Sequence, residues 1–186
     1  MITDTAVDAL AADARANAVR VAALRRDLSD AALTWRPDPS TWSVAEITQH
    51  LVTTTELYEP RMEALLPKAL ERAPGRRPFR PRRFAAWFIK MAGPESEKKL
   101  KAPKRFDPSS GDVGAEVLDR FVAQQEGLLE LMGRAADADL NRPRLGSPLT
   151  PLLRFSLGEA FLLLVRHQQR HLRQAERLLQ HDAFPG

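Results

Sequence analysis

Four long stretches of the sequence repeat apolar residues at intervals of three and four positions, and this periodicity is the strongest constraint on the fold. Such a repeat places apolar side chains along one face of an α-helix. No segment alternates apolar and polar residues with the period of two that marks a half-buried strand. We therefore expect no strands and an all-α fold, an antiparallel four-helix bundle, with helices over about 3–28, 43–66, 113–136 and 156–180.

Two of these stretches begin with the same four-residue pattern. Ser43 is followed three residues later by Glu46, and Ser156 by Glu159. In such a capping box, the serine hydroxyl accepts a hydrogen bond from the backbone N–H of the glutamate, and the glutamate carboxylate accepts one from the backbone N–H of the serine. The pattern predicts a helix start at each serine. Near Pro60 we expect a kink, or a stop after which the helix resumes through Met62, Leu65 and Leu66, because proline removes a helical hydrogen bond.

The remaining sequence reads as loops within one domain of residues 1–186. Ser29 and Asp30 end the first helix, and a loop follows. Residues 72–111 are rich in Pro, Arg and Lys and predict a long crossover insertion between the second and third helices, with one short apolar helix at Phe84–Met91. A short helical turn is expected at Pro151–Phe155, before the fourth helix.

Positive charge is concentrated in the insertion. Residues 72–105 contain 12 Lys and Arg but two acidic residues, whereas the whole chain has a net charge of +4. Basic side chains interleaved with aromatic ones are typical of surfaces that contact nucleic acid or anionic membranes. Prolines interrupt the arginines here, which favours a solvated, mobile insertion. Nucleic acid is therefore not the expected partner.

Composition also limits the class of protein. The chain has no cysteine, which excludes disulfides and thiolate ligands, so any metal must bind His, Asp or Glu. The first 19 residues have no continuous apolar stretch and do not resemble a signal peptide. The longest strongly apolar run, Ala160–Val165, is too short to span a bilayer. We expect a cytoplasmic protein with no transmembrane segment.

Three of the four histidines lie on predicted apolar helix faces. His167 and His171 are four residues apart in the fourth helix, so their imidazoles project from one face, one turn apart. Two imidazoles without partners are costly in a core, but together they can bind one metal ion. His50 lies on an apolar face of the second helix and joins them if the two helices are neighbours. Three protein ligands with an open position are typical of a catalytic zinc site. His181 instead follows the last helical turn, where the helix dipole favours a cation.

Two charged residues near these histidines are candidates for supporting roles in catalysis. Glu46 precedes His50 by four residues and shares its face. The capping box is the favoured interpretation of Glu46; the alternative is a partner for an imidazole or a base acting on metal-bound water. Arg170 lies beside the histidine pair and either extends to solvent or holds an anionic group of a substrate.

Two motifs together resemble a known family. The sequence WSVAEITQHL at 42–51 and the sequence HQQRHLRQ at 167–174 are similar to the helix-two and helix-four patterns of the DinB-like superfamily, the DNA-damage-inducible DinB/YfiT type of metal-binding four-helix bundle. KAPKRFDPSS at 101–110 also reads like this group. The resemblance implies that His50, His167 and His171 bind a divalent metal, often zinc or nickel. It also implies a homodimer.

The resemblance extends to function, where several alternatives stay open. The superfamily contains S-transferases and isomerases that use the thiols mycothiol or bacillithiol, and members described as metal-dependent hydrolases. The leading hypothesis is therefore a metal-dependent hydrolase or thiol-dependent S-transferase acting on a small molecule. Because the chain lacks cysteine, the sulfur would come from a low-molecular-weight thiol. The alternatives are a non-catalytic metal-binding module whose basic segment binds an acidic partner, and a metal-free scaffold whose histidines fill the core.

Overall fold

The computed structural model describes residues 5–73, 77–96, 102–108 and 111–185. It is mostly helical, as the periodicity predicts. In chain order, its elements are α1 (Thr5–Asp27), α2 (Asp30–Thr34), α3 (Val44–Leu70), α4 (Arg83–Ala92), the short 3-10 helix η2 (Lys104–Phe106), α5 (Val117–Arg134), β1 (Arg144–Gly146), β2 (Arg154–Ser156) and α6 (Leu157–Leu179). Residues 3 and 4 of the first predicted helix lie outside the described residues.

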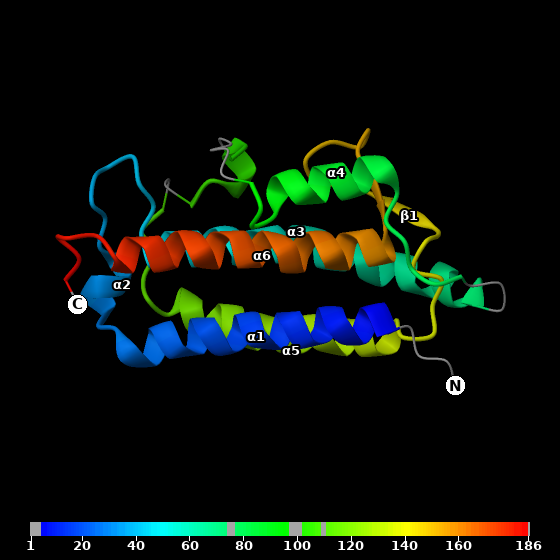
Figure 1. Cartoon of the computed structure of the whole chain (residues 1–186), viewed down its shortest axis with the longest axis horizontal. Coiled ribbons are helices and arrows are strands. Elements are labelled where there is room, and N and C mark those ends of the chain that lie inside the picture. Colours follow the sequence, from blue (N-terminus) through cyan, green and yellow to red (C-terminus); the bar gives the residue numbers. More distant parts are fainter. Residues whose placement is uncertain (1–4, 74–76, 97–101, 109–110, 186) are drawn as a thin grey trace.

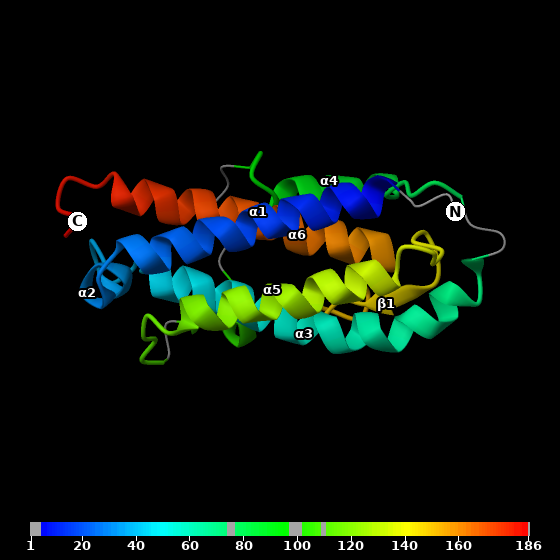
Figure 2. The ribbon, with the colours of Figure 1, turned by 90° about the horizontal axis from the view of Figure 1, so that it is seen from below.

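Four long helices, α1, α3, α5 and α6, run side by side along the long axis of the molecule (Figure 1 and Figure 2). α1 and α3 each contact both α5 and α6. α1 and α6 run in one direction, and α3 and α5 run in the other. α3 and α5 are parallel because the insertion carries the chain back along the molecule before α5 begins. This arrangement places α3 beside α6, and these are the two helices that carry the three histidines.

Both predicted capping boxes are present at helix starts. The Ser43 hydroxyl accepts from the Glu46 backbone N–H at 3.1 Å, and the Glu46 carboxylate accepts from the Ser43 N–H at 2.9 Å. The corresponding distances for Ser156 and Glu159 are 3.3 and 2.9 Å. Each glutamate is buried, and each also forms an ion pair with an arginine from a preceding segment: Glu46 with Arg36, and Glu159 with Arg82.

α3 continues without a stop through Pro60 and Pro67, and the apolar residues that were expected to follow Pro60 in the helix are buried in the core. Two other local predictions are wrong. The loop expected after Ser29 instead contains α2, and Ser29 caps this helix by accepting from the Ala32 N–H. The expectation of no strands also fails, since β1 and β2 form a small antiparallel sheet where a helical turn was expected at 151–155. Each strand has three residues, too few for alternation to stand out.

A layer of polar side chains divides the buried core into two apolar clusters. One cluster contains residues from the first halves of α1 and α6 and the second halves of α3 and α5. The other contains residues from the second halves of α1 and α6 and the first halves of α3 and α5. Between them, each long helix contributes buried polar residues: Asn17, Thr54, Thr55, Gln125 and Gln168. The Asn17 amide donates to the Gln168 side-chain oxygen at 3.1 Å. The histidines lie on α3 and α6 at about this level of the core.

The insertion packs against the long helices at both described elements. α4 lies on α6 and confirms the predicted short apolar helix, while η2 contacts α3. Ala85 and Ile89 of α4 enter the core, whereas Phe84 and Trp87 are more than half exposed. Other parts of the insertion, at 74–76, 97–101 and 109–110, lie outside the described residues. Within the described chain, no helix combines the length and apolar composition needed to cross a membrane.

Candidate metal centre

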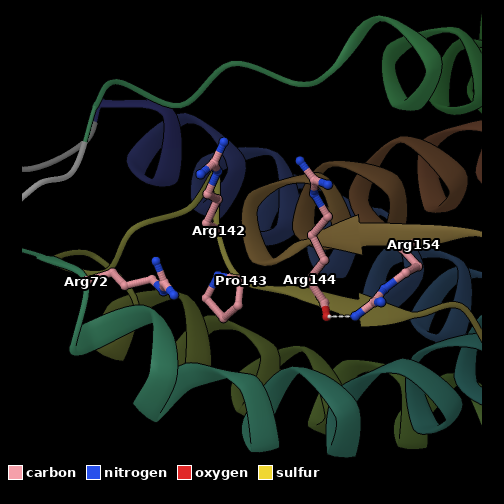
Figure 3. Close-up of a pocket in the computed structure, with 5 residues that line it drawn as sticks. All are labelled: Arg72, Arg142, Pro143, Arg144 and Arg154. Atoms are coloured by element: carbon pink, nitrogen blue, oxygen red, sulfur yellow. Dashed lines mark hydrogen bonds between the residues drawn. The ribbon is translucent and has the colours of Figure 1, made fainter.

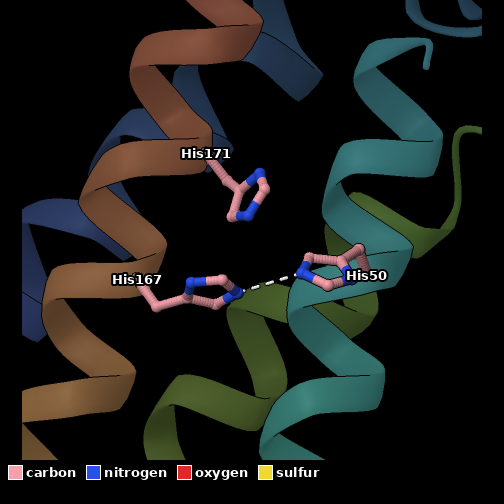
Figure 4. Close-up of side chains that lie close together, drawn as sticks. All are labelled: His50, His167 and His171. Atoms are coloured by element: carbon pink, nitrogen blue, oxygen red, sulfur yellow. Dashed lines mark hydrogen bonds between the residues drawn. The ribbon is translucent and has the colours of Figure 1, made fainter. Parts of the chain in front are cut away.

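The three predicted histidines meet between α3 and α6 (Figure 4). His50 projects from α3 toward His167 and His171 on α6, and the Nε2 atoms of His50 and His167 are 2.9 Å apart. One nitrogen from each ring lies within 4.8 Å of the other two. Among the described residues, this is the one group of three His, Asp or Glu side chains close enough to share an ion. The cluster is compatible with a bound metal.

The Nδ1 atom of each histidine faces an oxygen that can only accept a hydrogen bond. His50 Nδ1 donates to the Phe106 carbonyl at 2.7 Å, and His167 Nδ1 to the Ala92 carbonyl at 3.3 Å. His171 Nδ1 donates to the side-chain oxygen of Gln174 at 2.9 Å. A proton on Nδ1 leaves Nε2 with a lone pair in a neutral imidazole. The acceptors therefore select the tautomer that a metal bound through Nε2 requires.

Burial keeps the three imidazoles uncharged. Desolvation lowers the pKa of His167 to about 3, and the positive charge of a protonated His50 adds to this effect. Desolvation also lowers the pKa of His171 well below its ordinary value and lowers that of His50. Neutral imidazole is the form that binds metal, so the site is ready to bind an ion without first losing protons at neutral pH.

The geometry of the two closest nitrogens fits a cation between the rings. With Nδ1 protonated on both His50 and His167, neither Nε2 carries a proton to donate to the other. Two lone pairs then face each other across 2.9 Å, an arrangement that costs free energy unless a positive centre lies nearby. A divalent ion that prefers nitrogen ligands supplies that centre. The donor set has three nitrogens and no thiolate, since the chain has no cysteine.

Two aromatic side chains lie beside the histidines. The Trp42 ring lies 5.2 Å from the His50 ring and 6.3 Å from the His171 ring, measured between centroids. Phe106 supplies a carbonyl acceptor and also places its ring 6.4 Å from that of His50. Asp107 follows Phe106, and its charge opposes the lowering of the His50 pKa by desolvation. Trp42 belongs to the helix-two motif, but its contact with both histidines is not apparent from sequence.

The two candidate supporting residues are engaged in other contacts. The Glu46 carboxylate accepts from the Ser43 backbone N–H and pairs with Arg36. The Arg170 guanidinium donates to the carbonyls of Gly93 at 3.3 Å and Ser96 at 2.5 Å. These bonds hold the chain that follows α4. Ala92, the last residue of α4, supplies the carbonyl that accepts from His167 Nδ1. Both catalytic roles stay predictions.

The fourth histidine lies away from the cluster. His181 is exposed beyond the end of α6, where its ring centroid is 5.4 Å from that of Trp35. Its Nδ1 accepts from the Ala183 backbone N–H at 3.2 Å. His181 is therefore too far from the cluster to bind the same ion, and it serves as a control position for histidine variants.

The sequence from residue 14 to residue 175 matches the family model of the DinB superfamily. The chain belongs to the DinB superfamily. The matched range covers most of the chain and contains all three clustered histidines. No curated protein and no solved structure matches the chain. For this DinB-superfamily protein, function therefore has to be argued from the site.

Proposed function

We propose that this protein is a metal-dependent enzyme that acts on a small molecule, as a hydrolase or a thiol-dependent S-transferase. In this proposal, His50, His167 and His171 hold one zinc or nickel ion. The observation that carries it is the orientation of the three rings: each Nδ1 is fixed by an oxygen acceptor, and one nitrogen of each ring lies within 4.8 Å of the others. A divalent ion held there by three ligands would lower the pKa of a water or thiol in its open position.

The protein's own residues would orient and shield this site. The carbonyls of Phe106 and Ala92 come from two separate parts of the insertion, so folding of the insertion sets the ring orientations of His50 and His167. Trp42, whose ring lies beside those of His50 and His171, would limit access of water from its side. Arg170 holds the chain after α4 and would act as a positioning residue. Because the chain has no cysteine, a thiol cosubstrate would supply any sulfur that is transferred.

We propose the same organisation for the whole protein that the family resemblance implies. Residues 1–186 would form one domain, a four-helix bundle with a long crossover insertion at 72–111, in which α1 packs antiparallel to α5 and α3 packs antiparallel to α6. It would work in the cytoplasm as a homodimer. The oligomeric state is checked by light scattering of the untagged protein, where a mass near that of one chain contradicts the dimer.

Activity is tested with matched histidine variants. The untagged protein is loaded with zinc or nickel and assayed for consumption of low-molecular-weight thiols with electrophiles, and for ester and amide hydrolysis. We expect turnover in the wild type and in His181→Ala, and loss of turnover in His171→Ala with helical content retained. Metal binding by the wild type without turnover in any of these assays would favour the non-catalytic module. Equal turnover in His171→Ala and His181→Ala would contradict the proposed site.

A further inference from the structure

Four arginines line a pocket at the end of the molecule where α3 ends and the small sheet lies. The pocket has a volume of about 380 Å³ and is lined by Arg72, Arg142, Pro143, Arg144 and Arg154. Figure 3 shows Arg142 and Arg144 extending side by side, with Arg72 and Arg154 on opposite sides of them. This volume is within the range of small-molecule sites in proteins.

The register of the sheet explains why two of these arginines share a face. Leu145 of β1 pairs with Phe155 of β2, and both side chains are buried in the core. Because successive side chains of a strand point to opposite faces, Arg144 and Arg154 point away from the core. Arg72 reaches the same region because it lies just beyond the end of α3.

The positive charge of this arginine pocket is not balanced by the described parts of the chain. None of its four arginines forms an ion pair with a described carboxylate, although nine such pairs occur elsewhere. The Nε atom of Arg144 is buried and has no hydrogen-bond partner there. Arg154 donates to the Arg144 carbonyl at 3.1 Å, which leaves the rest of its guanidinium available. Unpaired guanidinium groups around a concave surface favour a bound anion.

We propose that the arginine pocket binds a small anion carrying two or more phosphate groups. Guanidinium groups match phosphate oxygens in bidentate pairs. Each guanidinium carries five N–H donors, so four of them offer more donors than the oxygens of one phosphate group can accept. A chain of linked phosphates satisfies more of these donors within one pocket.

This site is separate from the histidine cluster. Arg72 follows the end of α3 at Leu70, whereas His50 lies 20 residues earlier on the same helix. At a rise of 1.5 Å per residue, Leu70 lies about 30 Å from His50, and Leu157, three residues after Arg154, lies about 15 Å from His167. A bound polyphosphate therefore does not contact a metal held by the histidines, and each site can be removed without the other.

The test is calorimetric titration of the full chain with inorganic tripolyphosphate. The pocket variant Arg142→Gln/Arg144→Gln is compared with Arg15→Gln/Arg177→Gln, which removes the same charge from exposed positions outside the pocket. We expect one tripolyphosphate per chain in the wild type and the control, and affinity weakened about tenfold or more in the pocket variant. Orthophosphate should bind more weakly than tripolyphosphate. If the pocket variant does not fold, judged by its helical circular dichroism, the single variant Arg72→Gln replaces it with the same expectation.

Several results would overturn the proposal. Equal weakening in the pocket variant and the control would mean that binding depends on net charge alone. Absence of saturable binding at millimolar tripolyphosphate, or binding only to vesicles of anionic lipid, would also overturn it. Titration with a nucleoside triphosphate separates two sources of the same chemistry: tighter binding than tripolyphosphate supports a nucleotide, and equal binding supports an inorganic polyphosphate.

Discussion

Replacement of Arg82 by methionine tests the role of the buried ion pair at the start of α6. The Glu159 side chain is 1% exposed, and its carboxylate accepts from Arg82 Nη2 at 2.8 Å and from Arg82 Nε at 3.0 Å. The variant keeps most of the apolar length of Arg82 but removes the guanidinium. The remaining carboxylate is then buried with donors from backbone N–H groups, those of Ser156 and of residue 82 itself.

The size of the effect follows from this geometry. Removing one partner of a fully buried ion pair costs about 3–5 kcal/mol. The Arg82 side chain is 36% exposed and two backbone donors remain, so we expect a loss of about 2 kcal/mol in the free energy of unfolding. For a chain of this length, that loss lowers the melting temperature by about 4–8 °C.

The assay is urea unfolding at pH 7, followed by circular dichroism of the helices. Arg83→Met is the matched control, because Arg83 is the exposed neighbour of Arg82 and its loss removes the same charge. A double-mutant cycle with Glu159→Gln isolates the coupling between the two side chains. Equal stability of Arg82→Met and Arg83→Met would show that the ion pair between Arg82 and Glu159 does not stabilise the fold.

Two further predictions use the same buried polar groups. Burial by itself raises the pKa of Glu159, but hydrogen bonds from Arg82 outweigh it, so the pKa is lowered overall. The ionised carboxylate therefore stabilises the fold above its unfolded pKa of about 4.3, and this contribution is lost as the pH falls through the folded pKa. In Arg82→Met, the loss of stability should begin at a higher pH than in the wild type. Identical acid-unfolding midpoints for the two proteins would contradict this. Both polar side-chain atoms of Gln125 are buried without partners among the described residues. Gln125→Met should therefore raise the free energy of unfolding by about 1 kcal/mol. A lower free energy of unfolding in urea would show instead that internal water satisfies the amide.

Periodicity and capping predict most of the helical structure because both signals are local. The starts of α3 and α6 follow from Ser43 and Ser156, whose hydroxyl groups satisfy free N–H groups of the first turn. Periodicity does not predict α2, because a helix of five residues is too short to show an apolar stripe, although Ser29 is a good N-cap. The two strands are not predicted either, because each is too short to show alternation. Their pairing depends on burial of Leu145 and Phe155, which is a tertiary effect.

The candidate site is only partly readable from the sequence. The spacing of His167 and His171 places them together on one helix face without further information. His50 required the inference that its helix lies beside α6, and the structure shows this contact. The acceptors for His50 and His167 are backbone carbonyls at Phe106 and Ala92, 56 and 75 residues away in the chain. Any residue type offers a carbonyl, so no sequence signal identifies them.

We propose that His50, His167 and His171 bind one metal ion through Nε2. The most direct test is an anomalous difference map, recorded at the absorption edge of zinc or nickel, from crystals of the untagged, metal-loaded protein. We expect one strong peak between α3 and α6, about 2.0–2.1 Å from the Nε2 atom of each histidine for zinc. A peak bound elsewhere, or no peak between the rings at saturating metal, would contradict it.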